Sequence, residues 1–295
     1  MAGSTIPRRA LGRLLRELRT KVEKSQLAAG LSIEVSPQSI GRMEDGQPVK
    51  ISTPQMDVLL DFYQASTEDK AVALELLREV KAAKGDPAGW WRTYADVVAS
   101  HFDHYMSLEE ACSQLATFQL TLLPGLLQTA AYRRSMILTE RPEMSAVDVE
   151  RKIELAVRRQ ARIREDPDFS MDVLLSEAVL RHQVGGRQLM AEQLLHLIEV
   201  GRLPNVSIRV LPLDAGSHLG LVVQSFTLFE FPPLRASRLI EPPVVFVEGY
   251  DGALFLEEPR VIERRQKALE DVGRVALDHD DTRRLVVGIA EEYAA

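Results

Sequence analysis

The chain has 295 residues and a formal net charge of −7 at pH 7, a length that allows about two domains of the usual size. Its 45% hydrophobic and 27% charged residues are typical of a globular protein, and no tract of roughly 20 apolar residues suggests a membrane span. Basic residues continue through the apolar positions of the N-terminal segment, so we expect no secretory signal and a cytoplasmic protein.

Five helices are predicted in the first 84 residues. Apolar residues at helical spacing indicate a first helix over residues 8–24, with basic residues on its other face. The other four helices begin at recognisable N-terminal signals: Ser25, Ser36 before Pro37, Thr53 and Thr67. We therefore expect an all-α domain over residues 1–84.

A second domain that contains both helices and strands is predicted over residues 90–295. Residues 85–89 form the expected linker, because two glycines and a proline interrupt the helical pattern there. Helices are expected over residues 108–120, 125–138 and 146–164. Short β-branched runs then predict strands over 171–175, 206–211, 222–231, 244–247 and 253–256. Helices over 177–182, 186–200 and 259–275 alternate with them, which indicates an α+β domain.

The net charge hides an asymmetry along the chain. Residues 1–50 carry nine Lys and Arg against five Asp and Glu, a net of +4, and the remaining residues sum to −11. A basic arm of this kind neutralises phosphates while an acidic body is repelled from DNA. On charge alone, a basic helix that is merely solvated is an equal alternative.

Residues 25–46, SQLAAGLSIEVSPQSIGRMEDG, resemble the helix-turn-helix of Xre-type, lambda-repressor-like regulators. The residues that carry this resemblance are Ser25, Gln26, Ser36, Ile40, Glu44 and Gly46. Capped helix N-termini aim backbone N–H groups at phosphates, and the second helix of such a motif lies in the major groove. The resemblance implies a lambda-repressor-like fold for the five helices and binding to double-stranded DNA. A helical hairpin that never touches DNA is the alternative.

The resemblance also implies roles for single residues. The expected DNA-binding set is Gln26, Ser36, Gln38, Ser39 and Arg42 from this motif, with Arg8, Arg9 and Lys50 from the basic arm. Gln38, Ser39 and Arg42 would read bases, because Gln pairs with adenine and Arg with guanine through two hydrogen bonds. Gln26 would contact a phosphate. Arg19 and Glu44 would form a structural pair.

Three positions depart from the family pattern. Pro37 lacks a side-chain donor or acceptor where the family often has a base reader. Gly30 replaces the usual Ala of the first motif helix. Glu34 replaces the usual Gly of the turn, so the turn must tolerate a residue with a side chain or be rearranged.

Later motifs look like a C-terminal domain common in actinobacterial Xre-type regulators. They are Trp90 with Trp91, LPGLLQT at 123–129, the basic run at 150–162, SEAVLR at 176–181, LPNV at 203–206 and VEG at 247–249. That domain has no established biochemical activity. Some of its carriers are antitoxin-like and encoded beside a small protein. The resemblance therefore implies a partner-binding or signal-receiving domain.

Five residues after the first domain are candidates for a site that binds a partner protein or a ligand. These are Trp90, Trp91, Gln128, Glu177 and Arg181. For Glu177 and Arg181, four residues apart, a helix salt bridge is the favoured alternative. Five aromatic residues could form a ligand cage, but packing in the core is the favoured interpretation: Trp90, Trp91, Phe102, Tyr105 and Tyr132.

Enzyme chemistry has weak support in the sequence. His101 and His104, with Cys112, Asp103, Glu109 and Glu110 nearby, form the best metal candidate, and surface or packing roles are favoured for them. Cys112 is the single cysteine and is expected to be buried. No phosphate-binding Gly-rich loop or Ser-His-Asp order is visible. We therefore expect no cofactor, no metal and no enzyme activity.

The expected function is that of a homodimeric DNA-binding transcriptional regulator that is antitoxin-like. One recognition helix contacts too few base pairs for useful specificity, so a dimer is expected. A small acidic protein encoded nearby would control it through the second domain. A small-molecule-responsive regulator with a pocket in residues 90–295 is the alternative. An enzyme with a vestigial DNA-binding head is a weaker one.

Overall fold

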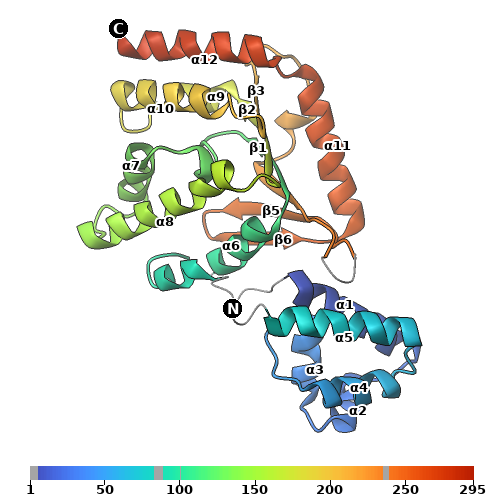
Figure 1. The fold of residues 1–295 in the computed structure, drawn as a ribbon. Helices are drawn as coiled ribbons and strands as arrows, with labels where there is room; N and C mark the ends of the chain where they lie inside the picture. Colours follow the sequence, from blue (N-terminus) through green and yellow to red (C-terminus); the bar gives the residue numbers. More distant parts are fainter. Residues whose placement is uncertain (1–5, 83–88, 100, 235–238) are drawn as a thin grey trace. The chain divides into compact units, whose positions relative to one another are not determined.

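The chain forms two compact units in the computed structural model, which describes residues 6–82, 89–99, 101–234 and 239–295. The helical unit comprises Met1–Thr93, Ala99–Ala111 and Phe231–Pro242, and the sheet unit comprises Tyr94–Val98, Cys112–Glu230 and Pro243–Ala295. Figure 1 labels the elements of both. Of the predicted linker at 85–89, all residues but Gly89 lie outside the described residues.

The five predicted N-terminal helices are confirmed. They are α1 (Ile6–Lys21), α2 (Gln26–Ser32), α3 (Pro37–Glu44), α4 (Thr53–Phe62) and α5 (Thr67–Ala82), and η1 (Trp90–Tyr94) and α6 (Phe102–Ala111) follow. Ser25 and Ser36 cap α2 and α3, each accepting a hydrogen bond at 3.1 Å from the backbone N–H three residues on. The cap of α4 is Ser52, one residue earlier than predicted, in a reciprocal pair with Gln55.

The turn between α2 and α3 explains two of the unusual residues. Glu34 has a φ of 56°, the left-handed conformation for which glycine is the usual residue. The turn therefore keeps its shape with a side chain at this position. Gly30 has a separate reason to lack one, because a Cβ there would lie 2.6 Å from the carbonyl oxygen of Val35.

Two substitutions in this turn should have opposite effects. Gly30→Ala should lower the free energy of unfolding by about 1 to 3 kcal/mol, because the added Cβ forces the Val35 carbonyl to move. Glu34→Gly should leave stability unchanged or raise it by up to about 1 kcal/mol, because it relieves a left-handed non-glycine residue. Calorimetry on the full chain measures both. A Gly30→Ala chain as stable as wild type would contradict the tight turn.

The sheet unit is built on one six-stranded mixed sheet in the order β3-β2-β1-β4-β5-β6. The strands are β1 (Gln114–Gln119), β2 (Ser170–Ser176), β3 (Val206–Leu211), β4 (Phe226–Glu230), β5 (Val244–Gly249) and β6 (Gly252–Leu256). β1, β2 and β3 pair in parallel, and β4, β5 and β6 continue the sheet with antiparallel pairing. The predicted mixed α+β fold is confirmed.

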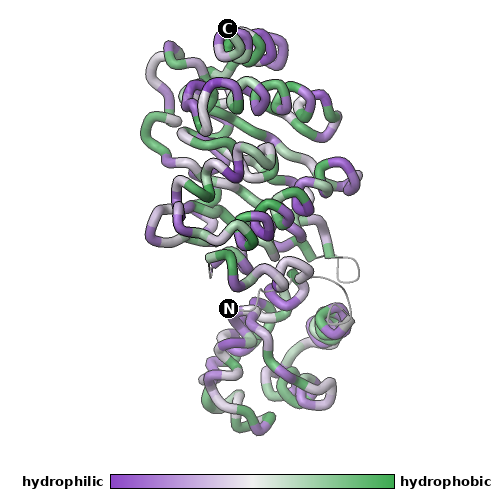
Figure 2. The backbone as a smooth tube through the Cα atoms, turned by 90° about the vertical axis from the view of Figure 1, so that its left-hand side faces the viewer, coloured by the Kyte–Doolittle hydropathy of each residue, from purple (hydrophilic) through white to green (hydrophobic). Residues whose placement is uncertain are grey.

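Helices cover both faces of this sheet. The remaining helical elements are η2 (Gly125–Leu127), α7 (Ala130–Glu140), α8 (Ala146–Glu165), α9 (Glu177–Arg181), α10 (Arg187–Val200), η3 (Leu219–Leu221), α11 (Pro259–Val275) and α12 (His279–Ala294). Figure 1 shows α7, α8 and α10 on one side of the strands and α11 on the other. Ile262 and Val272 of α11 pack on strand residues such as Phe118 and Val245. Figure 2 shows mainly hydrophobic strands and outer helices of alternating hydropathy.

The predicted helix over residues 108–120 is wrong. The helix α6 ends at Ala111, and Gln114–Gln119 is the strand β1 in the middle of the sheet. Leu115, Thr117 and Phe118 are all buried because both faces of the strand are covered. A strand buried on both faces loses the alternation of polar and apolar residues that identifies it in a sequence.

The predicted helix over residues 125–138 is wrong in its first part, where only the short η2 forms and α7 begins after Thr129. Glutamine side chains bind the backbone of this loop instead. Gln128 Nε2 donates to the Leu123 carbonyl at 2.7 Å. Gln193, fully buried, accepts from the Thr129 N–H at 2.6 Å and donates to the Leu127 carbonyl at 2.8 Å. These bonds replace the hydrogen bonds of a helix.

Candidate nucleic-acid interface

The helix α3 has one buried and one exposed face. Ile40 and Met43 are buried in the helical unit, whereas Gln38 and Arg42, four residues apart, are exposed on the same side. Ser39 is partly exposed, and its hydroxyl lies 3.0 Å from that of Ser36 at the helix start. The structure thus brings the predicted base readers together on one accessible surface.

A buried carboxylate joins the three helices of the motif. Arg19 of α1 binds Glu44 of α3 through two hydrogen bonds, Nε to Oε1 at 2.5 Å and a terminal nitrogen to Oε2 at 2.8 Å. Gln26 of α2 donates to the same Oε2 at 3.0 Å. The Glu44 side chain is only 1% exposed. Gln26, predicted as a phosphate contact, is therefore also part of this internal network.

The backbones of α1 and α3 pass close to each other beside this network. A Cβ on Gly12 of α1 would lie 2.5 Å from the Met43 carbonyl oxygen and 2.7 Å from that of Glu44. Only glycine permits this approach. The short distance lets the Arg19 guanidinium reach the carboxylate at the end of α3.

The network holds Glu44 in its charged form. Burial raises the pKa of this carboxyl, but the hydrogen bonds from Arg19 and Gln26 and the charges of Arg19 and Arg16 outweigh burial, and the net pKa is lowered. A carboxyl with a lower pKa in the folded state stabilises that state above its unfolded pKa and loses this contribution as the pH falls.

Glu44→Gln should remove this pH dependence. In the wild type, the stability of α1 and α3 should fall as the pH drops below the ordinary glutamate value of 4.5. The variant should be less stable at neutral pH by about 1 to 3 kcal/mol, because Arg19 keeps no charged acceptor there. Hydrogen exchange of the α1 and α3 amides against pH measures both. The control is Glu17→Gln, an exposed residue of α1; equal pH profiles for the two variants would contradict the role of Glu44.

The arginines at the start of α1 bind a second buried carboxylate. Arg9 is 5% exposed, and its Nε lies 3.5 Å from Oε2 of Glu241, which is 2% exposed. Arg13 forms an ion pair with the other oxygen of Glu241. Glu241 belongs to the segment Phe231–Pro242, which lies in the helical unit although it joins β4 to β5 in the chain. The burial of Arg9 argues against its predicted contact with DNA.

Arg8 and Lys50 differ in their accessibility. Burial lowers the pKa of the Arg8 guanidinium, and the positive charge of Arg92 lowers it further. Arg8 is partly buried, whereas Lys50 and Arg42 are exposed. Neither of the last two forms an ion pair with any residue that the structure describes. Their positions suit contacts with phosphates or bases.

Glu241→Ala should destabilise the start of α1. The substitution leaves the Arg9 guanidinium buried without its counter-charge, which typically costs about 3 to 5 kcal/mol. Hydrogen exchange of the α1 amides in the full chain should show faster opening. Glu17→Ala, on the exposed side of the same helix, is the control. Protection of α1 that is equal in both variants would show that the Glu241 pair contributes nothing.

The residues predicted for a partner or ligand site are divided between the two units. Trp90 and Trp91 lie in the helical unit, packed edge to face, and Trp91 Nε1 donates to Asp103 at 2.7 Å. Gln128 lies in the sheet unit and binds the loop described above. The five residues of the aromatic cage are likewise divided, because Tyr132 is buried in the sheet unit.

Glu177 and Arg181 form the helix salt bridge that was the favoured alternative, at 2.6 Å. The other Glu177 oxygen accepts from the Leu213 backbone N–H at 3.1 Å, and Arg181 lies 3.4 Å from Glu292. Glu177 is buried. The pair therefore connects α9 to the segment after β3 and to α12.

Among the residues described, no group of three or more His, Cys, Asp or Glu side chains is placed to hold a metal ion. Cys112 is buried, as expected from the sequence. No helix in the described ranges has both the length and the apolar character needed to cross a bilayer.

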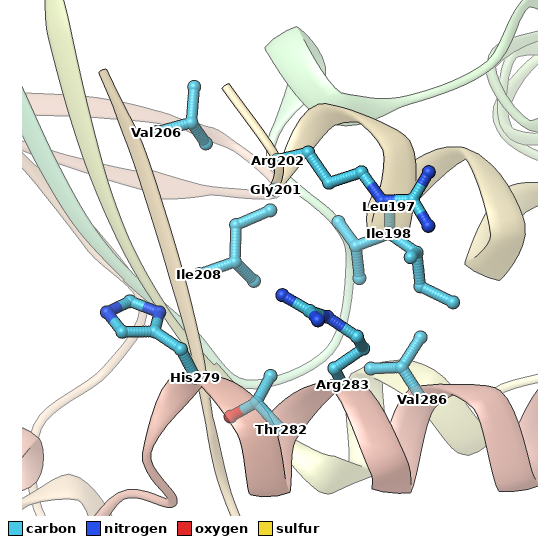
Figure 3. A pocket seen from close by; sticks show the side chains of 10 residues that line it. All are labelled: Leu197, Ile198, Gly201, Arg202, Val206, Ile208, His279, Thr282, Arg283 and Val286. Carbon is cyan, nitrogen blue, oxygen red and sulfur yellow. The ribbon is translucent and has the colours of Figure 1, made fainter. Parts of the chain in front are cut away.

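A cavity of about 380 Å³ in the sheet unit brings together residues that sequence analysis did not single out. It lies among α10, β3 and α12 (Figure 3). Its lining combines apolar side chains with three basic ones, Arg202, His279 and Arg283. His279 and Arg283 lie four residues apart on α12, but Arg202 is distant from both in the chain and the three follow no motif, so the sequence did not identify them as one group. Glu241 was missed for the same reason.

Two family models match the chain. Residues 10–73 match a family of helix-turn-helix domains, so the chain contains a DNA-binding helix-turn-helix, which supports a role in transcription regulation. Residues 102–287 match a domain of unknown function (DUF5753), and because this match covers more than half of the chain, the protein belongs to that family. Neither the curated proteins nor the solved structures include a significant match.

Proposed function

We propose that the chain is an Xre-type transcriptional regulator that binds DNA as a homodimer through α3. The observation that carries the proposal is the exposed face of a capped α3 with Gln38, Ser39 and Arg42, within a matched helix-turn-helix. Gln and Arg are the side chains that read adenine and guanine by paired hydrogen bonds. Pro37, at the first turn, contributes geometry and no such contact.

Arg42→Ala should weaken binding to the operator by about 1 to 3 kcal/mol and relax its specificity, because Arg42 reads a base. Lys50→Ala should weaken operator and random DNA alike and reduce the salt dependence, because its contact is with a phosphate. The operator is first selected from random DNA with the full chain, and affinities are then measured by fluorescence anisotropy. An equal loss on operator and random DNA for Arg42→Ala would exclude base reading.

The homodimer follows from the small size of one recognition helix. Two copies would read half-sites separated by one helical turn of DNA, about 10 base pairs. Sedimentation of the full chain with a selected operator measures the stoichiometry. One chain per operator at saturation would contradict this part of the proposal.

Control by a small acidic partner protein, in the manner of an antitoxin, is the proposed role of the sheet unit. Exposed apolar side chains between β3 and β4 support it: Leu213 is 66% exposed, Leu221 70% and Val222 80%. These side chains lie in one connecting segment, and we propose that their exposed apolar surface is where the partner binds. A stoichiometric small protein that copurifies with the wild type and is lost with Leu221→Asp would support this role. The absence of any such protein would oppose it.

Response to a small molecule is the second candidate, and the cavity among α10, β3 and α12 favours it. A ligand that binds only the folded state raises the melting temperature of the chain. The proposed function includes no catalytic step and no cofactor, and it places the protein in the cytoplasm. Turnover that survives deletion of residues 1–84 would favour instead an enzyme with a vestigial head.

A further inference from the structure

The cavity in the sheet unit has apolar walls from three elements. Leu197 and Ile198 come from α10, Val206 and Ile208 from β3, and Val286 from α12. In Figure 3 these side chains surround an open space between the strand and the two helices. At about 380 Å³ the cavity lies within the range of small-ligand sites, roughly 300 to 1,000 Å³. Such walls favour the apolar body of a ligand.

The guanidinium of Arg283 supplies the polar feature of this cavity. Figure 3 shows it extending from α12 to a place between Ile208 and the α10 side chains. A guanidinium carries five N–H donors. Within the described residues Arg283 makes no hydrogen bond, and its ion pair with Asp280 is long, at 3.9 Å. Its donors therefore remain available to a ligand.

Two further basic groups lie at the same cavity. Arg202 follows the end of α10, where Glu199 holds it at 2.7 Å, and His279 is the first residue of α12. Neither Glu199 nor Asp280 is among the lining residues, and no other carboxylate is among them. The cavity therefore has a positive lining in a chain whose net charge is −7.

We propose that this cavity binds a small amphipathic carboxylate, with its apolar body among Leu197, Ile208 and Val286 and its carboxylate on Arg283. The planar fork of a guanidinium matches a carboxylate through two parallel hydrogen bonds. Arg202 adds positive charge to the lining, and His279 adds an imidazole that can hydrogen-bond to the ligand. This site rests on the small-molecule response that is the second candidate function and names its ligand class, and its occupation requires neither DNA nor a partner protein.

Calorimetric titration of the full chain tests this site with 4-phenylbutyrate and octanoate as probes. Both carboxylates should bind saturably with one molecule per chain. The neutral analogue 4-phenylbutan-1-ol should bind at least about tenfold more weakly, because it cannot form the charged pair. Equal affinity for the alcohol, or no saturable binding of either carboxylate in the millimolar range, would overturn the proposal.

Arg283→Ala and Arg284→Ala form a matched pair. Each removes one positive charge from α12 and both side chains are exposed, Arg283 by 53% and Arg284 by 73%, but Arg284 pairs with Asp281 and does not line the cavity. Arg283→Ala should lower the affinity for 4-phenylbutyrate by about tenfold, and Arg284→Ala should leave that affinity unchanged. Equal weakening by both would show general charge attraction only and would overturn the site. Circular dichroism confirms that each variant folds.

Reversal of the charge sharpens the test. Arg283→Glu should lose binding of the carboxylates and gain binding of the cation 4-phenylbutylamine, which the wild type should not bind. Retained carboxylate binding in this variant would exclude Arg283 as the anchor. DNA affinity of the same variants is measured without ligand. Failed probe binding with intact DNA binding removes only the ligand site, whereas failed DNA binding in the wild type removes only the proposed regulator.

Discussion

The buried carboxylate of Glu44 is the constraint on which the arrangement of the helix-turn-helix depends. A buried charge is tolerated only when opposite charge and hydrogen bonds surround it. Arg19 and Gln26 provide them from α1 and α2, and Gly12 lets the helices approach closely enough. The three helices thus share one acceptor group. This internal bonding fixes the angle at which α3 presents its opposite face.

Internal ion pairs also engage much of the basic charge of the N-terminal segment. Four of its arginines lie against carboxylates inside the helical unit: Arg9, Arg13, Arg16 and Arg19. Lys24 lies over the Phe62 ring. The net charge of +4 over residues 1–50 therefore overstates the positive charge that this segment presents to DNA phosphates. The cations best placed for DNA are at α3 and just after it, where Arg42 and Lys50 are exposed.

In the sheet unit, the polar residues of the sequence motifs have structural roles. Gln128, Glu177 and Arg181 belong to the motifs found in the sequence, yet each bonds to the backbone or to a neighbouring helix. Buried polar groups of this kind keep loops in place. Arg283 has no such engagement among the described residues and stands beside an apolar cavity. In this unit, the residues of the sequence motifs stabilise the fold, whereas Arg283, which belongs to no motif, has hydrogen-bond donors available to a ligand.

Local interactions specify several elements, and those elements could be located from the amino-acid sequence. Helix caps at Ser25 and Ser36, the helix at Pro259–Val275 and the strand at Val206–Leu211 depend on neighbours within a few residues, and their positions were predicted. Three other features became visible only in the folded chain: Gln114–Gln119 is a central strand, Glu241 pairs with Arg9, and Arg283 lines one cavity with Ile208. Those residues are brought together by packing over long separations in the chain, and burial on both faces erases the periodicity that a single sequence can show.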